Sequence, residues 1–150
     1  MTTIKAGLGA ALCLAPLVAS AQEVRDCDGY AANARFLMML SATEPAVRSF
    51  ANGEVRAIGL DTVEPACCWA HLMVDFMVAD EPFPHCMLVS ADGGEGFSGL
   101  RFSEMTARYD PAVGLILTVP AGRFDGALSV SSPLEVIVNR ATGTVTARHF

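Results

Sequence analysis

The chain has 150 residues, of which 52% are hydrophobic, and a formal net charge of −6 at pH 7. Nucleic acids and anionic membrane surfaces are bound through clusters of Lys and Arg that neutralise phosphates. The acidic balance of this chain, with no basic cluster to offset it, therefore argues against both kinds of partner.

The first predicted element is a signal peptide over residues 1–21. Lys5 precedes an uncharged run over residues 6–19, and the small-residue motif Ala19-Ser20-Ala21 follows. This order of basic, apolar and small residues is typical of a secretory signal. The apolar run is shorter than the ~20 residues that a membrane-spanning helix needs. We therefore expect cleavage after Ala21, export to the periplasm or the medium, and no membrane insertion.

Two helices are predicted next. Asp28–Leu40 (DGYAANARFLMML) is rich in alanine, contains no proline, begins with a residue that can cap a helix, and has apolar residues at helical spacing. Ser41–Glu44 then has the spacing of a capping box and is followed by Pro45. This pattern predicts a short second helix over residues 44–51.

The rest of the chain has the pattern of strands separated by turns rich in Gly, Pro, Asp and Asn. The predicted strands are EVRAIGL, HLMVDFMV, HCMLVS, VGLILTV, LEVIVN and TVTARHF. Helices followed by antiparallel strands predict an α+β fold, a single disulfide-stabilised domain over residues 22–150. In it, one or two N-terminal helices pack on a curled antiparallel sheet of about six strands. The alternative is a β-barrel or β-sandwich with an N-terminal helix.

The segment 69–78 fits either a helix or a strand. One set of apolar residues has helical spacing (Trp69, Leu72, Met73, Phe76, Met77), and an overlapping set alternates as in a strand (Leu72, Val74, Phe76, Val78). The β-branched residues and the EPFP turn favour a strand that forms a hairpin with residues 85–91. With Met77 opposite His85, the predicted core face carries Leu72, Val74, Phe76, Cys86 and Leu88.

Four cysteines remain after processing: Cys27, Cys67, Cys68 and Cys86. An even number in an exported chain indicates disulfides, because the compartment is oxidising. In a straight hairpin, Cys68 and Cys86 lie roughly 26 Å apart at ~3.3 Å per residue, too far for a bond. The hairpin therefore predicts Cys27–Cys86, with Cys67 and Cys68 either bonded to each other or free.

If residues 69–78 instead form a helix, Cys86 can reach the adjacent pair. Two ordinary bridges then result, one of which ties the N-terminal helix to the sheet, and we take these structural bridges as the expected arrangement. A bond between Cys67 and Cys68 would be strained and more easily reduced, which indicates a switch. The absence of a C-x-x-C motif weakens the case for a thiol oxidoreductase.

A metal site is a further hypothesis. The hairpin places thioethers and imidazoles on the face opposite the core: His71, Met73, Met77, His85 and Met87. Such ligands suit copper. The competing interpretation is that the methionines fill gaps in a packed face.

No catalytic motif is complete. Gly96-Phe97-Ser98-Gly99 resembles a nucleophile elbow, but Leu100 stands where the motif needs glycine. We therefore expect an exported, non-catalytic binding or accessory domain with a protein or small-molecule partner and no cofactor. The alternative is a periplasmic copper-handling or thiol-redox protein that uses Cys67, Cys68 and the His/Met face.

Overall fold

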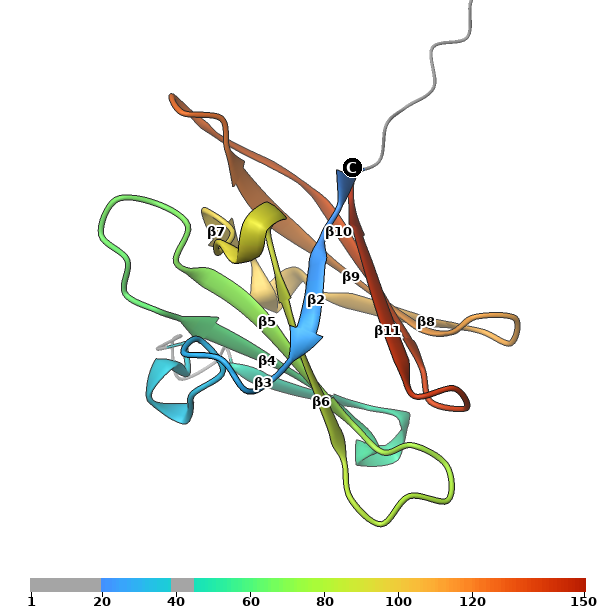
Figure 1. Ribbon diagram of the computed structural model, residues 1–150. Helices are drawn as coiled ribbons and strands as arrows, with labels where there is room; N and C mark the ends of the chain where they lie inside the picture. The colour runs from blue at the N-terminus through green and yellow to red at the C-terminus, as the bar shows by residue number, and fades with distance from the viewer. Residues whose placement is uncertain (1–19, 39–44) are drawn as a thin grey trace, which may run out of the picture.

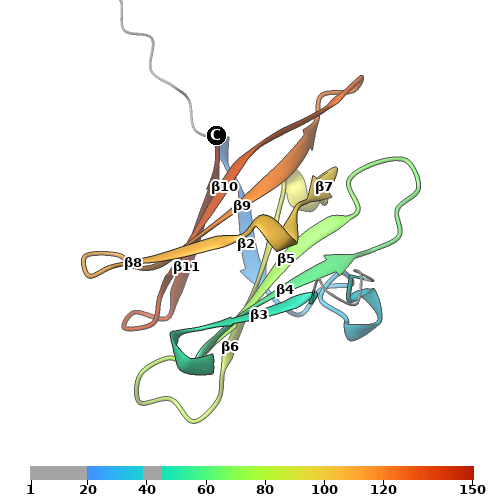
Figure 2. The same cartoon turned by 180° about the vertical axis from the view of Figure 1, so that it is seen from behind.

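A computed structural model describes residues 20–38 and 45–150, which fold into two packed antiparallel sheets (Figures 1 and 2). The predicted signal peptide lies outside the described residues except for Ser20–Ala21, which form the edge strand β1. Cleavage after Ala21 would remove this two-residue strand from its partner, β11. Export and cleavage stay predictions.

Each sheet is named here by its part of the chain. The N-terminal sheet has the order β2-β6-β5-β4-β3, with strands β2 (Glu23–Asp26), β6 (His85–Ser90), β5 (Ala70–Phe76), β4 (Val55–Asp61) and β3 (Val47–Phe50). The C-terminal sheet has the order β1-β11-β10-β9-β7, with strands β11 (Thr144–His149), β10 (Ser129–Asn139), β9 (Gly114–Phe124) and β7 (Gly99–Leu100), and with β8 (Thr106–Asp110) also paired to β9. Short 3-10 turns lie between strands: η1 (Ala34–Phe36), η2 (Ala51–Gly53), η3 (Asp92–Gly94) and η4 (Phe102–Glu104).

The helix predicted over residues 28–40 is absent from the described residues. In its place are loops and the single turn η1. The Asn33 side chain accepts a hydrogen bond from the backbone N–H two residues further on (3.0 Å), which offers the backbone an alternative to a helix. Leu37 then forms an isolated antiparallel bridge with β4. The chain is therefore extended where the predicted helix would continue.

The second predicted helix, over residues 44–51, is also wrong. β3 occupies half of it and pairs antiparallel with β4. Phe50 packs against the core, and this tertiary contact outweighs weak local helix signals, because short helices are marginal without packing. Residues 39–44, on which parts of both predicted helices fall, lie outside the described residues.

The predicted α+β class is therefore wrong. The helices of the described residues are 3-10 turns of three residues each, and none of them could cross a membrane. The alternative, a β-barrel or β-sandwich with an N-terminal helix, is also wrong, because it too includes that helix. What the structure has is a fold of two antiparallel sheets.

The main core lies between the sheets. Alternate residues of the central strands point inward, as the period of two in a strand requires. The inward residues include Leu72, Val74 and Phe76 of β5, Leu117 and Val119 of β9, and Leu134, Val136 and Val138 of β10, each at most 1% exposed. A smaller cluster on the outer face of the N-terminal sheet packs Ala31 and Phe36 on Leu60 and Leu88. The segment after β2 thus covers a sheet face without being helical.

The hairpin of β5 and β6 confirms the strand interpretation of residues 69–78 but shifts its register. Phe76 pairs with His85, where the sequence places Met77. A slip of one residue moves every side chain of a strand to the other face. Met87 consequently packs against the core, and Cys86 lies on the outer side.

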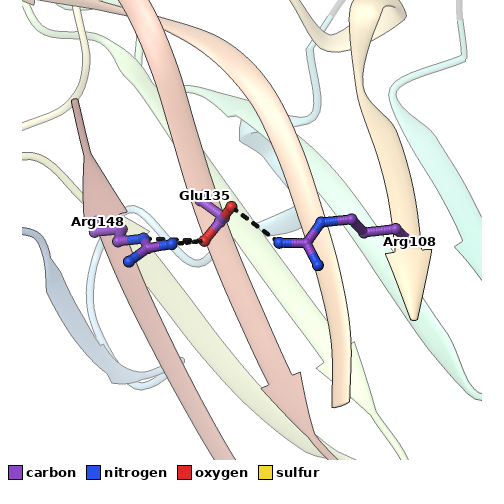
Figure 3. Close-up of polar contacts among 3 residues, drawn as sticks. All are labelled: Arg108, Glu135 and Arg148. Atoms are coloured by element: carbon purple, nitrogen blue, oxygen red, sulfur yellow. Dashed lines mark hydrogen bonds and ion pairs between the residues drawn. The ribbon is translucent and has the colours of Figure 1, made fainter. Parts of the chain in front are cut away.

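A charged row crosses the C-terminal sheet. Glu135 of β10 is only 12% exposed at its side chain and lies between two arginines (Figure 3). Arg148 of β11 donates two hydrogen bonds to its Oε1 (2.9 and 2.5 Å). Arg108 of β8 lies 3.5 Å from its Oε2. One carboxylate therefore links two other strands of the same sheet.

Candidate functional site

An open cavity of about 660 Å³ lies beside the adjacent cysteines. It is called here the Cys67–Cys68 cavity. Its walls come from segments far apart in the chain, among them Arg25, Tyr30, Cys67, Cys68, His71 and Phe124. Its volume is in the range of small-molecule sites, which combine apolar walls with a few polar groups.

All four cysteines of the described residues are in disulfides. Cys27 bonds Cys86 with their Cα atoms 5.5 Å apart, and Cys67 bonds Cys68. The expectation of two ordinary bridges is therefore wrong, because the β5–β6 hairpin carries Cys86 away from the adjacent pair. Cys27–Cys86 is the bond that a straight hairpin requires, and the Cys67–Cys68 bond is one of the two states that it leaves open for the adjacent pair.

The loop between β4 and β5 holds the adjacent pair. It is closed at its base, where the Thr62 backbone N–H and hydroxyl both donate to the Trp69 carbonyl oxygen (2.9 and 3.2 Å). Within it, Val63 and Cys68 have φ angles of 59° and 67°. Non-glycine residues rarely adopt this left-handed conformation, which stores strain and often occurs at functional sites.

The loop between β4 and β5 packs closely against Gly96. Its neighbour Phe97 exchanges two backbone hydrogen bonds with Ala70 (3.0 and 2.7 Å), which draws the Cys68 carbonyl group against Gly96. A Cβ atom at residue 96 would lie 2.6 Å from the Cys68 carbonyl carbon, a separation that real side chains do not show. The absence of a side chain at Gly96 therefore positions Cys68.

The serine of this GFSG motif has a structural contact. The Ser98 hydroxyl lies 2.5 Å from the Ser129 hydroxyl. This bond joins the residue before β7 to β10.

His71 is the buried polar group of the cavity. It is 4% exposed, and its Nδ1 lies 2.9 Å from the hydroxyl oxygen of Ser90, which is itself fully buried. Burial, and secondarily the positive charge of Arg25, lower the pKa of His71 from 6.5 to about 4. The ring is therefore neutral at pH 7 and can exchange hydrogen bonds without adding charge.

Arg25 brings the positive charge. One of its terminal nitrogens lies 3.6 Å from the Glu23 carboxylate. Its Nε is buried and has no hydrogen-bond partner among the described residues. The Arg25 side chain is 40% exposed, so its terminal nitrogens, and not the buried Nε, are the atoms suited to bind a ligand oxygen.

The structure divides the residues of the metal hypothesis among four places. His71 and Met73 lie on the outer face of β5, Met87 packs against the main core, and Met77 follows the end of β5. His85 is at the turn, where its Nε2 lies 2.6 Å from a Glu81 carboxylate oxygen. In the described part of the chain, no three His, Cys, Asp or Glu side chains are grouped to hold a metal ion.

Sequence reasoning singled out Cys67, Cys68 and His71 but missed Arg25, Tyr30 and Phe124. These residues belong to no motif, and they meet only because β2, the following loop and the end of β9 converge. Comparisons of the chain with protein-family models, curated proteins and solved structures find no match.

Proposed function

We propose that this protein is an exported binding domain whose small-molecule ligand occupies the Cys67–Cys68 cavity. The observation that carries the proposal is the cavity of about 660 Å³ with walls from four or more separate segments. The two disulfides fit an extracellular or periplasmic protein. The predicted signal peptide supports the same location.

The cavity walls define the chemistry of the proposed ligand. Tyr30 and Phe124 contribute exposed aromatic rings, 68% and 42% exposed, which favour a flat, apolar ligand body. Arg25 and the neutral His71 favour a hydrogen-bonding polar group on that ligand. We therefore expect a ring-containing small molecule that carries an oxygen acceptor for Arg25.

A panel of ring-containing fragments, screened by ligand-observed NMR, tests the proposal. Fragments that bind the wild type should bind Phe124→Ser about tenfold more weakly, because a lost aromatic contact is worth about 0.5–1.5 kcal/mol beyond its buried area. Phe83→Ser is the control, since Phe83 is 75% exposed and lies in the turn at the opposite end of β5. Equal binding to all three proteins would refute the assignment of the site.

A further inference from the structure

The two disulfides differ in what they can contribute to folding. Cys27 and Cys86 are 59 residues apart in sequence, and Cys67 and Cys68 are adjacent. A disulfide stabilises a fold mainly by shortening the loops of the unfolded chain, and the effect grows with the length of the closed loop. A bond between neighbours closes almost no loop. A role in stabilising the fold therefore explains the Cys67–Cys68 bond poorly.

The setting of Cys67–Cys68 is that of a reactive bond. Both residues are only partly buried, and both line the open cavity. Cys68 has a left-handed backbone, and neighbouring cysteines can form a ring only with strain. Strained or accessible disulfides are the labile ones, whereas structural disulfides resist reduction.

We propose that Cys67–Cys68 is a thiol–disulfide exchange site whose reaction partner is a dithiol. A thiolate of the dithiol attacks one cysteine sulfur, the bond between Cys67 and Cys68 breaks, and the other sulfur leaves as a thiolate that takes up a proton. The second thiol of the partner then attacks the mixed disulfide and releases the first cysteine. The dithiol becomes a disulfide, and this protein gains two electrons and two protons as two thiols.

Breaking this bond removes the covalent constraint on Cys68. The cavity wall formed by residues 66–68 can then change shape on the Cys67 side, while the Phe97–Ala70 hydrogen bonds still hold the chain beside Gly96. Trp69, the single tryptophan of the chain, is next to the bond and half-buried. Its fluorescence therefore reports the reaction independently of any bound ligand.

Dithiothreitol titration of the native, exported protein tests the proposal. At each concentration, free thiols are trapped with N-ethylmaleimide and located by peptide mass mapping, while Trp69 fluorescence is recorded. We expect Cys67 and Cys68 to be trapped at a dithiol concentration at least about tenfold lower than Cys27 and Cys86. The fluorescence change should follow the first step only.

The double variant Cys67→Ser/Cys68→Ser is the matched control. It should show no fluorescence change over the concentrations of the first step, with Cys27–Cys86 intact. If Cys27–Cys86 of the wild-type protein is reduced first, or if both bonds are reduced at the same dithiothreitol concentration, that result by itself would overturn the proposal. So would the absence of trapped thiols at residues 67 and 68 until the protein unfolds.

Discussion

At the scale of single residues, His71 shows how the fold changes the chemistry of a side chain. The ring is buried beside Ser90 and shares a cavity with Arg25, so both desolvation and positive charge disfavour its protonation. An imidazole on the surface would be partly charged near pH 6.5. Here the ring is held neutral, which suits a hydrogen-bonding role toward a ligand.

The lowered pKa of His71 predicts a loss of stability in mild acid. Below pH 6.5 the unfolded chain binds a proton that the folded ring does not bind until about pH 4. The free energy of unfolding should therefore fall as the pH falls through this window, by about 2 kcal/mol between pH 7 and pH 5. Urea unfolding at each pH measures it.

His71→Gln provides the control for this pH effect. The variant lacks the titrating ring, so its free energy of unfolding should fall less steeply between pH 7 and pH 5 than that of the wild type. An NMR titration of the wild-type ring checks the cause directly. A His71 ring that titrates near pH 6.5 would contradict the prediction.

Gly96 makes a second prediction at this scale. In Gly96→Ala the new methyl group would meet the Cys68 carbonyl group and lie 2.9 Å from the Ala70 backbone nitrogen. We expect a loss of about 1–3 kcal/mol in the free energy of unfolding, the usual effect of overpacking. Gly99→Ala is the control, because no atom lies within 4 Å of its added carbon. Similar losses in the two variants, measured by urea unfolding, would exclude the close approach as the cause.

At the scale of elements, the strands are joined by pairs of side chains as well as by their backbones. Glu135 links β10 with β8 and β11 through Arg108 and Arg148. Its side chain is largely shielded from water, unlike that of Glu104, which is 54% exposed where it pairs with Arg101. Shielded and networked pairs keep more of their attraction than exposed ones.

This difference predicts unequal effects of charge removal. Glu135→Gln should lower the free energy of unfolding by about 1 kcal/mol at low ionic strength, and by less in about 1 M salt. Glu104→Gln should change it by less than about 0.5 kcal/mol. Urea unfolding of both variants at two salt concentrations measures the effect. An unchanged stability of Glu135→Gln at low salt would show that the two ion pairs of Glu135 make no net contribution to the free energy of unfolding.

At the scale of the whole molecule, Cys27–Cys86 joins the loop after β2 to β6 and closes 59 residues of chain. It also holds the segment that covers Leu60 and Leu88 on the outer face of the N-terminal sheet. Loss of this bond should therefore weaken the packing of that segment on the outer face. It should also increase the conformational entropy of the unfolded chain.

The two disulfides should differ sharply in their effect on stability. Cys27→Ser/Cys86→Ser should lose about 4 kcal/mol in the free energy of unfolding, from the loop-closure entropy of a loop of this length. Cys67→Ser/Cys68→Ser should lose little, because its bond closes no loop of consequence. Urea unfolding of both double variants measures the two losses in the free energy of unfolding. A comparable loss in the second variant would mean that the adjacent bond is structural after all.

Much of the sheet structure was predictable from the sequence. All six predicted strands overlap strands of the structure, and HCMLVS coincides with β6. The two predicted helices were wrong, because the spacing of apolar residues in a short segment is compatible with both a helix and extended chain. Tertiary packing decides between the two. β2, β3 and β8 were missed because each has only four or five residues, too few for a clear alternation. β2 pairs with β6 far along the chain, whereas β3 and β8 pair with the next strand in sequence.

The sequence by itself determined the strand-forming segments and the condition that a straight hairpin excludes any bond between Cys86 and the adjacent cysteines. Both follow from local rules, the period of two and the rise per residue of a strand. Only the tertiary structure decided the register of β6, the covering of the outer face and the meeting of Arg25, Tyr30 and Phe124 with Cys67–Cys68. These depend on contacts between distant segments, where one residue of slip or one alternative pairing leaves the local pattern unchanged but alters which side chains meet.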